Sequence, residues 1–584
     1  MRHWSSQSCP DNAWRPFPDQ ANRQAYRLHQ LRPGLHRPAS RAERLLRCSD
    51  SRPWRGRHAH APCDRCRRLV LQHLRRGGLH CGGGLMDTIT LTAATLAGNE
   101  RGRATDIFIE ADRIADLQPT GARPPQGTVI DASRLLVTPG LIDGHHHSHE
   151  NYLKGRFEGQ PLELVMNFVR PLKPVPLTAR QVYVRTLISA IQAIRSGATT
   201  LVDDMNVGPM LDRSHVDAAF QAYEDCGIRA LLGFTLFDRP FFRAMPFVEE
   251  EFPAELLAQL DAVRPTPAGD VLALAREMAR SRHPSEHRVG YIVAPSAPQR
   301  CTDDFLKATR SLADEFDLPV MIHVQETRLQ AVTGQIMYGS SMFAHLDRLG
   351  FLKEKTALIH AVWLTPADIS IIAASGASVQ HNPTVNMKLG SGLMPMREML
   401  DAGINVSLGT DGCGLIETAD MLRAVSNTAY VQKLRGNDPD RWITAPEAFH
   451  AATKGGARAL GLEKQIGEIK VGMKADLSGY SLDQIAFVPL NDPIRQLVYA
   501  ETGSGLRLSI VDGTVIFRDG KLTLIDEAAI LREAQEIHAE LEPIITAVEE
   551  SVAPLLAPYR RIHARCLCHP IASDTYPARF ECAL

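Results

Sequence analysis

Strand-like and helix-like segments alternate eight times along the middle of the chain, and this alternation restricts the fold more than any other feature. Apolar, β-rich segments occur at 137–147, 199–206, 229–237, 289–294, 319–325, 357–362, 378–382 and 405–410. The stretches between them have the apolar period of helices, as at 179–196 and 303–317. Eight β/α units in succession predict a closed parallel (β/α)8 barrel, a TIM-like α/β fold. A doubly wound sheet is the alternative, but no GxGxxG follows the first predicted strand.

Further β-rich segments flank this region on both sides. They lie at 88–92, 106–109, 129–130, 135–137, 467–469, 475–477, 509–511 and 515–517. Asp512-Gly513 between the last two predicts a hairpin turn. We therefore expect a small β-sandwich domain assembled from 86–137 and 465–525, with the barrel at 138–464.

The C-terminal region has the composition of a helix. Residues 526–558 are rich in Ala, Glu and Leu, with Asp526 as a predicted N-cap and Pro554 as a predicted stop. Residues 559–584 are expected to be a poorly ordered tail.

The first 85 residues differ in composition from the rest. They hold 17 arginines, no lysine and five acidic residues, although the net charge of the chain is −1. A zinc site at Cys63 and Cys66, an arginine-rich arm for nucleic acid and a transit peptide are alternative interpretations. We expect instead a disordered extension, or translated sequence upstream of a true start at Met86.

The remainder of the chain is acidic, which does not favour nucleic-acid binding. No apolar run is long enough to span a membrane. The few, widely spaced cysteines of the body suggest no disulfide framework. We expect a cytoplasmic homo-oligomer that acts on a small molecule, with no nucleic-acid or membrane partner.

Histidines and an aspartate occur where the predicted strands end. The first strand ends in 145-HHHSH-149, the fifth carries His323, the sixth His360, and the eighth ends at Asp411. Residues i and i+2 of a strand point the same way, so His145 and His147 share a side and His146 faces away. Imidazole and carboxylate ligands without thiolate suit Zn²⁺ or Fe²⁺.

A single histidine at a strand end is more often structural than a ligand. Four coincident strand ends make independent structural roles a poor explanation, so we predict a metal site. His147 and His149 form an alternative HxH pair, but the preceding 139-PGLIDG-144 favours His145 and His147.

Several motifs together resemble the amidohydrolase superfamily, in the branch that holds methylthioadenosine/S-adenosylhomocysteine, guanine and cytosine deaminases and triazine hydrolases. They are 139-PGLIDGHHH-147, 323-HVQET-327, 358-LIHAVWL-364, 381-HNPTVNMKLGSG-392, 409-GTDG-412 and 466-IGEIKVGMKADL-477. The resemblance covers residues 86 to about 530. It implies that His145, His147, His323 and Asp411 bind the metal, and that Glu326, His360 and Asp411 are catalytic.

Two positions depart from the pattern of the family. Ser296 stands where the family often has a substrate-contacting His, and Trp363 replaces the second His of HCxHL. These departures argue against purine nucleosides as substrates. Candidate substrate contacts are Gln325, Ser296, Trp363, Asn382, Asn386, Met387 and Cys413, whose amide and apolar groups suit a neutral planar ring.

The resemblance also implies a mechanism. Metal-activated water attacks an sp² carbon, Glu326 protonates the adjacent ring nitrogen, Asp411 carries a proton to the leaving group and His360 orients the hydroxide. Relatives with two metals use a bridging carboxylated lysine, and residues 291–300 contain no lysine, so one ion is expected, Zn²⁺ before Fe²⁺.

Three other functions remain open at this point. The same machinery could open a lactam or amide ring or remove chloride from a triazine. A metal-free barrel could be retained for binding or assembly, and the arginine-rich segment could contact nucleic acid. The leading hypothesis is hydrolytic deamination of a nitrogen heterocycle.

Overall fold

The computed structural model describes residues 88–98, 104–208 and 211–578. The interpretations of residues 1–85, including Cys63 and Cys66, lie outside the described residues, as do residues 579–584 of the expected tail.

Eight parallel strands follow one another in the order predicted from the sequence. They are β6 (Leu141–His147), β7 (Ala198–Met205), β8 (Arg229–Phe234), β9 (Val289–Tyr291), β10 (Val320–Val324), β11 (Thr356–His360), β12 (Ser378–His381) and β13 (Val406–Leu408). They form two sheets, β14-β6-β7-β8-β9 and β10-β11-β12-β13, in which β14 is Asp411–Gly412.

The two parallel sheets are joined at both sides, at one by a hydrogen bond and at the other by the chain itself. The amide of Met321 donates to the carbonyl of Val293 over 3.0 Å, which joins β10 to the segment after β9. Strand β14 comes directly after β13 and pairs with β6, where Asp411 lies opposite His146. Each strand therefore has a partner from the next unit, and the C-terminal ends of the first and last strands meet.

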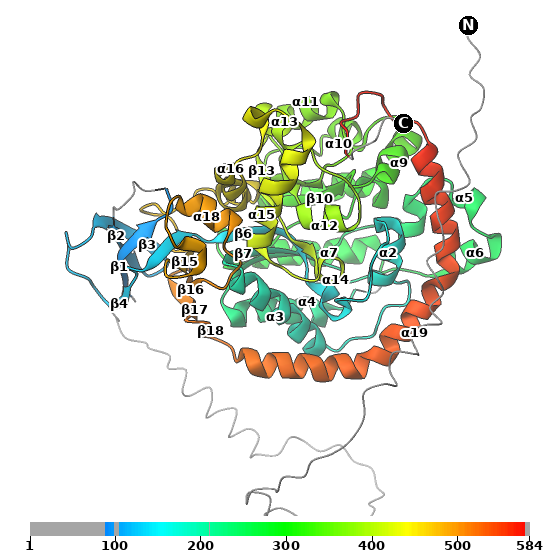
Figure 1. Cartoon of the computed structure of the whole chain (residues 1–584). Helices are drawn as coiled ribbons and strands as arrows, with labels where there is room; N and C mark the ends of the chain where they lie inside the picture. The colour runs from blue at the N-terminus through cyan, green and yellow to red at the C-terminus, as the bar shows by residue number, and fades with distance from the viewer. Residues whose placement is uncertain (1–87, 99–103, 209–210, 579–584) are drawn as a thin grey trace, which may run out of the picture. The chain divides into compact units, whose positions relative to one another are not determined.

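Helices connect the strands and lie around them (Figure 1). The helices are α2 (Leu162–Val169), α3 (Ala179–Arg195), α4 (Arg213–Cys226), α5 (Val248–Glu251), α6 (Ala254–Ala262), α7 (Ala268–Ser281), α8 (Asp303–Phe316), α9 (Arg328–Tyr338), α10 (Met342–Arg348), α11 (Pro366–Ser375), α12 (Pro383–Lys388), α13 (Met396–Asp401), α14 (Cys413–Ile416), α15 (Met421–Val431), α16 (Ala445–His450), α17 (Gly456–Ala459), α18 (Pro493–Tyr499) and α19 (Glu527–Cys568).

Local sequence sets the helix ends. The hydroxyl of Thr178 accepts from the amide of Gln181 to start α3, and Thr302 starts α8 in the same way. Among the described residues, none of these helices is both long and apolar enough to cross a membrane.

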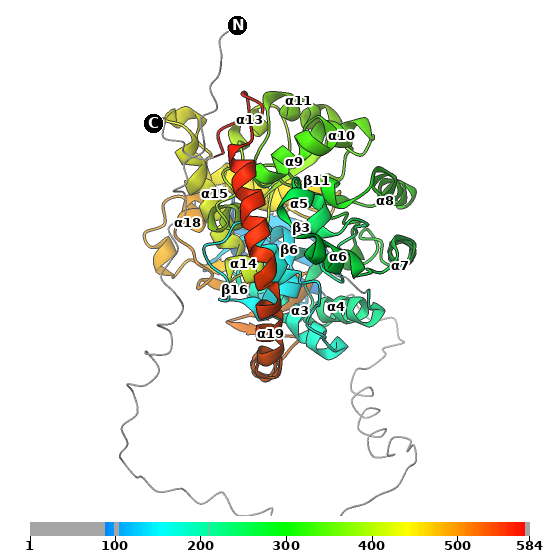
Figure 2. The same cartoon turned by 90° about the vertical axis from the view of Figure 1, so that its right-hand side faces the viewer.

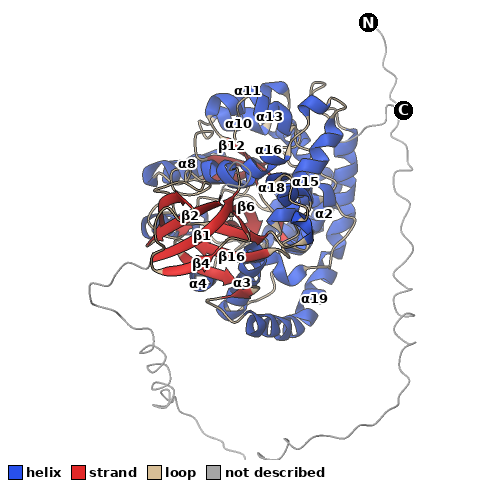
Figure 3. Ribbon diagram, turned by 60° about the vertical axis from the view of Figure 1, so that its left-hand side comes forward, coloured by secondary structure: helices blue, strands red, loops and turns tan. Residues whose placement is uncertain are grey.

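The flanking β segments hydrogen-bond into one sheet of nine strands, many of whose buried apolar residues form one core cluster, and its arrangement as a sandwich stays a prediction. The strands are β1 (Thr88–Leu96), β2 (Ala104–Glu110), β3 (Arg113–Pro119), β4 (Thr128–Asp131), β5 (Leu135–Pro139), β15 (Leu477–Ser481), β16 (Leu506–Val511), β17 (Thr514–Arg518) and β18 (Lys521–Leu522). The antiparallel pair β5–β15 joins the N-terminal strands of this sheet to the C-terminal ones. Figure 3 shows β1, β2, β4 and β16 of this sheet in red. The strand expected at 467–469 is wrong: this segment is irregular, and Gly467 has a φ of 94°.

Helix α19 also differs from the prediction. It begins at the expected N-cap, where the Asp526 carboxylate accepts from the amide of Ala529 over 3.0 Å, but it continues past Pro554 to Cys568. Each proline removes one backbone hydrogen bond and bends the helix. The helix curves along the edge of the molecule's described body, and Figure 2 shows it crossing the face turned toward the viewer.

Residues 559–578 are packed, which corrects the expectation of a poorly ordered tail there. Tyr559, Ile562 and Cys566 are buried in one apolar cluster with residues of α5 and α6. After the helix, the amide of Tyr576 donates to the carbonyl of Leu364 over 2.9 Å. The buried apolar residues of α19 hold the helix against the rest of the structure, although it contains three prolines.

This packing predicts the effect of changing Tyr559. Its ring lies 5.2 Å from the ring of Phe252 and is 2% exposed. Tyr559→Ala should lower the free energy of unfolding by about 3–5 kcal/mol, because it leaves a cavity. Tyr559→Phe, which keeps the ring, should change little. Urea denaturation of both variants measures this, and equal midpoints for Tyr559→Ala and the unaltered protein would contradict the packing.

Candidate metal centre

Four strand ends bring their histidines and an aspartate to one place. His145 and His147 end β6, His323 is on β10, His360 ends β11 and Asp411 begins β14. His145 Nε2 lies 3.2 Å from His323 Nε2 and 3.9 Å from Asp411 Oδ2. His147 Nε2 lies 3.5 Å from Asp411 Oδ1. The donor atoms of His145, His147 and His323, and those of His145, His360 and Asp411, each lie within 4.8 Å of one another.

Hydrogen bonds fix which nitrogen faces this centre. His147 Nδ1–H donates to the carbonyl of Asp204 over 2.7 Å, and His323 Nδ1–H donates to the carbonyl of Ser296 over 2.8 Å. Each Nε2 therefore carries a lone pair directed at the centre. Burial lowers the pKa of His147 well below its usual value, which keeps this imidazole neutral.

The centre gathers imidazole nitrogens and a carboxylate, all of them buried or partly buried. Burial raises the pKa of Asp411 to about 6, because the carboxylate has lost contact with water. Neutral imidazoles and a carboxylate are ligands of divalent transition metals, so these residues fit such an ion.

Three residues around the centre have a strained backbone conformation. Gln325, His360 and Asp411 have φ values of 45°, 74° and 72°. Non-glycine residues in this left-handed region cost free energy and persist only where the surrounding structure holds them. At Asp411, the left-handed backbone is accompanied by a 2.7 Å hydrogen bond from the amide of Gly412 to Oδ1.

Glu326 lies beside His360 at the edge of the centre. Its Oε2 is 3.4 Å from His360 Nε2, and Ser391 Oγ–H donates to its Oε1 over 3.1 Å. Burial, with the nearby Glu163, raises the pKa of Glu326 to about 8, which favours the protonated carboxyl at neutral pH. A protonated carboxyl next to a cavity is suited to donate a proton.

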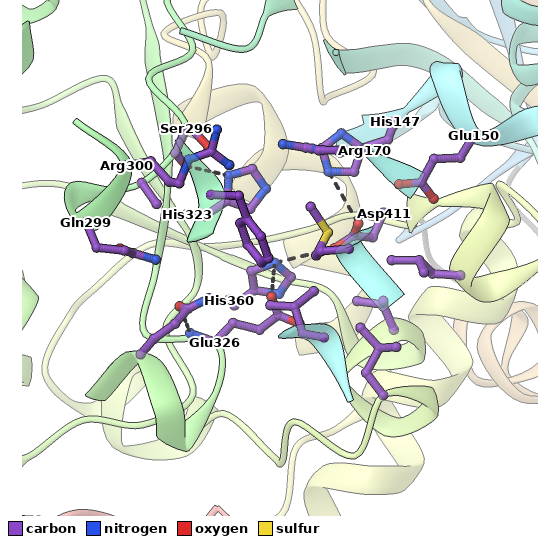
Figure 4. Close-up of a pocket in the computed structure, with 18 residues that line it drawn as sticks. His147, Glu150, Arg170, Ser296, Gln299, Arg300, His323, Glu326, His360 and Asp411 are labelled. Atoms are coloured by element: carbon purple, nitrogen blue, oxygen red, sulfur yellow. Dashed lines mark hydrogen bonds and ion pairs between the residues drawn. The ribbon is translucent and has the colours of Figure 1, made fainter. Parts of the chain in front are cut away.

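A cavity of about 560 Å³ opens onto these groups (Figure 4). Its polar lining residues are His147, Glu150, Arg170, Ser296, Gln299, Arg300, His323, Glu326, Gln330, His360 and Asp411, and its apolar ones include Leu162, Met166, Phe241, Val385, Leu389 and Leu415. Of the predicted substrate contacts, Ser296 lies on this wall.

Gln325 and Trp363 do not line this cavity, which corrects their expected place. The amide of Gln325 donates to the carbonyl of Trp363 and accepts from the amide of Met342 over 2.7 Å. Trp363 Nε1–H donates to the carbonyl of Ser391 over 2.8 Å. Both residues line a different, smaller pocket, together with residues that follow α19.

Asn382, Asn386, Met387 and Cys413 are also absent from the cavity wall. Asn386 Oδ1 accepts from His360 Nδ1 over 3.0 Å, and Asn382 Nδ2 donates to Asp411 Oδ2 over 3.3 Å. These two amides orient the groups that face the cavity. Met387 is 41% exposed, whereas Cys413 is fully buried.

The other two histidines of the cluster turn away. His146 hydrogen-bonds with Ser189 Oγ over 2.7 Å and with Thr410 Oγ1 over 3.3 Å. His149 Nδ1 accepts from the amide of Asn206 over 3.2 Å, and its ring lines a neighbouring cavity. The pair that converges with His323 is therefore His145 and His147.

Sequence reasoning missed several polar residues of the cavity, notably Arg170, Gln299 and Arg300. Gln299 and Arg300 stand in the 291–300 segment after the fourth predicted strand, so their position was a usable signal. Arg170 is the C-cap of α2 and carries no local motif that points to the site.

A family model supplies the decisive comparison. The model described as "Amidohydrolase family" matches residues 136–516. The chain belongs to the amidohydrolase family.

Several known amidohydrolase relatives are similar over most of the chain. A 5-methylthioadenosine/S-adenosylhomocysteine deaminase of Thermococcus kodakarensis is 34% identical, over 70% of this chain and 89% of the relative. A 5'-deoxyadenosine deaminase of Methanothermobacter thermautotrophicus is 30% identical, over 75% of this chain and 95% of the relative. The crystal structure of a Xanthomonas campestris adenosine deaminase with bound zinc is 26% identical, with a TM-score of 0.68, and the match covers 78% and 98% of the two chains. An atrazine chlorohydrolase structure from Arthrobacter aurescens (21% identical, TM-score 0.68, 77% and 100% covered) shares the fold.

The different surroundings of His145 and His149 give a matched test of the centre. His145→Asn should strongly reduce the metal content of the purified protein, because it removes one of the converging nitrogens. His149→Asn should leave the content unchanged, because His149 hydrogen-bonds with Asn206 instead. Plasma mass spectrometry of both variants measures metal per chain, and the reverse pattern would place the ligands two residues later.

Proposed function

We propose that the eight parallel strands close into a (β/α)8 barrel with its active site at one end. The hydrogen bond between Met321 and Val293 and the β14–β6 pairing support this closure. Active sites of such barrels lie at the C-terminal ends of the strands. That is the end at which the histidines and Asp411 gather.

We propose further that this amidohydrolase deaminates a small nitrogen heterocycle by hydrolysis of a carbon–nitrogen bond. The observation that carries the proposal is the combination of converging, unprotonated Nε2 atoms and Asp411 with a buried Glu326 whose pKa is raised to about 8. Relatives named as deaminases of methylthioadenosine, S-adenosylhomocysteine and 5'-deoxyadenosine support the same reaction class.

The proposed cofactor is one Zn²⁺ ion held by His145, His147, His323 and Asp411. Zinc in the Xanthomonas campestris adenosine deaminase structure supports this choice over Fe²⁺. None of the described residues that line the cavity is a lysine, so the lining offers no carboxylated lysine to bridge a second ion. When bound, such an ion lowers the pKa of a water molecule toward neutrality.

The residues of the chain then supply the proton transfers. The Glu326 carboxyl gives its proton to the ring nitrogen beside the attacked carbon as the water oxygen adds there. Asp411 accepts one proton from that oxygen and delivers it to the amino group, which leaves as ammonia when the carbon–nitrogen bond breaks. The remaining proton on the oxygen passes to the Glu326 carboxylate, which restores the carboxyl as the carbonyl forms. His360, held through Nδ1 by Asn386, places its Nε2 3.5 Å from Asp411 Oδ2 and orients the attacking oxygen.

Glu326 separates proton donation from metal binding. Glu326→Gln should retain the metal, because none of the four proposed ligands changes, and the fold, because Gln matches Glu in size. Turnover should nevertheless fall by about 10²- to 10⁴-fold, the usual effect of removing a positioned acid. Glu354→Gln, at an exposed position, is the matched control. Normal turnover in Glu326→Gln, with metal content measured in parallel, would rule out this mechanism.

A substrate panel tests the reaction class itself. Amino-substituted purines, pyrimidines and triazines should release ammonia from at least one ring type, measured by a coupled ammonia assay. Release of chloride from chlorotriazines, or of a ring-opened acid from lactams, without ammonia from any amine would favour the dechlorinase or ring-opening alternatives.

A further inference from the structure

Two arginines line the same cavity as the metal centre. Arg170 follows the last turn of α2, and Arg300 ends the short 3-10 helix η5 (Pro298–Arg300). In Figure 4 Arg300 lies near Ser296 and Arg170 is drawn over His147, both in the upper part of the view, whereas Glu326 lies below His360. The sequence suggested a pocket for a neutral ring, whereas the observed wall carries two cationic side chains.

Arg300 is buried without a counter-ion. Only 7% of the residue is exposed, and its Nε–H donates to the carbonyl of Arg239 over 3.0 Å. Its guanidinium stacks over Phe237 at 4.4 Å and approaches Phe241 at 5.6 Å. No carboxylate of the described residues lies within ion-pair distance of Arg300, and its two Nη groups make no hydrogen bond with those residues.

Arg170 also has a buried donor without a partner, although its charge acts on the nearby carboxylates of Glu150, Asp204 and Asp411. Its Nε is buried and has no hydrogen-bond partner among the described residues. The positive charge of Arg170 contributes to lowering the pKa of Arg300, whose larger cause is burial, so the two guanidinium groups are close enough to influence each other. Two like charges facing one cavity repel each other unless an anion lies between them.

A buried arginine elsewhere in the same molecule shows how such a charge is normally satisfied. Arg229 is 3% exposed, and its Nε lies 2.7 Å from Asp476 Oδ2. Burying an unpaired charge is costly, so proteins pair it or bind a counter-ion. The missing partner of Arg170 and Arg300 is therefore expected in the cavity.

We propose that Arg170 and Arg300 bind a carboxylate group of the substrate. A guanidinium presents parallel N–H donors that match the two oxygens of a carboxylate. The proposal rests on the proposed deamination for its orientation: the carboxylate lies at the arginines while the reacting nitrogen faces Glu326. The substrates are then amino-substituted heterocyclic acids rather than neutral rings.

Matched ligand pairs test this assignment. Each isomer of aminopyrimidine carboxylate is compared with its carboxamide, which has the same shape and no charge. Isothermal titration calorimetry on the metal-loaded enzyme gives the Kd of each. At least one acid should bind tighter than its amide by about 10- to 100-fold, the effect of one charge-assisted hydrogen-bonded pair.

Variants assign the preference to the arginines. Arg300→Met keeps an apolar side chain against Phe237 and removes the charge. Arg170→Met likewise replaces the charged side chain at the end of α2 by an apolar one. Both should abolish the preference with unchanged metal content, whereas Arg213→Met, an exposed arginine on α4, should retain it. If Arg300→Met fails to fold, Arg170→Met alone tests the proposal.

Two results would overturn the assignment. One is an equal or lower affinity for every acid relative to its amide. The other is a preference that survives in both arginine variants, which would mean that the acids bind the metal directly. Arginine-dependent binding of acids without release of ammonia would instead disprove the deamination and leave the anion site standing.

Discussion

The site depends on holding neutral imidazoles and a carboxylate together away from water. Two of the rings are oriented by the hydrogen bond on the nitrogen that faces away from the centre, His147 to the Asp204 carbonyl and His323 to the Ser296 carbonyl. These carbonyls belong to neighbouring parallel strands or to the loops that follow them, so the direction of each lone pair is fixed by the sheet itself. The strained backbone at His360 and Asp411 is the local cost of this arrangement.

The parallel strands and their functional ends were predictable from the sequence because both follow local rules. Alternation along a strand separates His145 and His147 from His146, and the structure has them on opposite sides. Gln325 does not follow this rule, because its φ of 45° ends the regular alternation and its side chain hydrogen-bonds with Trp363 instead. Arg170 is far from Gln299 and Arg300 in the sequence, and no periodic pattern indicates that the three residues line one cavity.

Helix α19 shows the limit of reading prolines as stops. Ion pairs of Arg195 with Glu527, Arg180 with Glu533 and Arg156 with Glu542 attach its first half to the body of the molecule. Its second half buries Tyr559 and Ile562. The free energy gained by this packing exceeds the loss of backbone hydrogen bonds at three prolines. Composition and helix propensity do not include tertiary packing, so they could not predict the length of the helix.

The order of these elements along the chain has a consequence for biosynthesis. Strand β5 pairs with β15, so this pairing cannot form until the whole parallel-stranded region has been translated. Tyr559, which α19 contributes later still, packs against Phe241 on the cavity wall. A nascent chain that has exposed the proposed metal ligands, of which Asp411 comes last, therefore lacks a finished cavity. These ligands emerge first, and the apolar wall around Phe241 is completed afterwards.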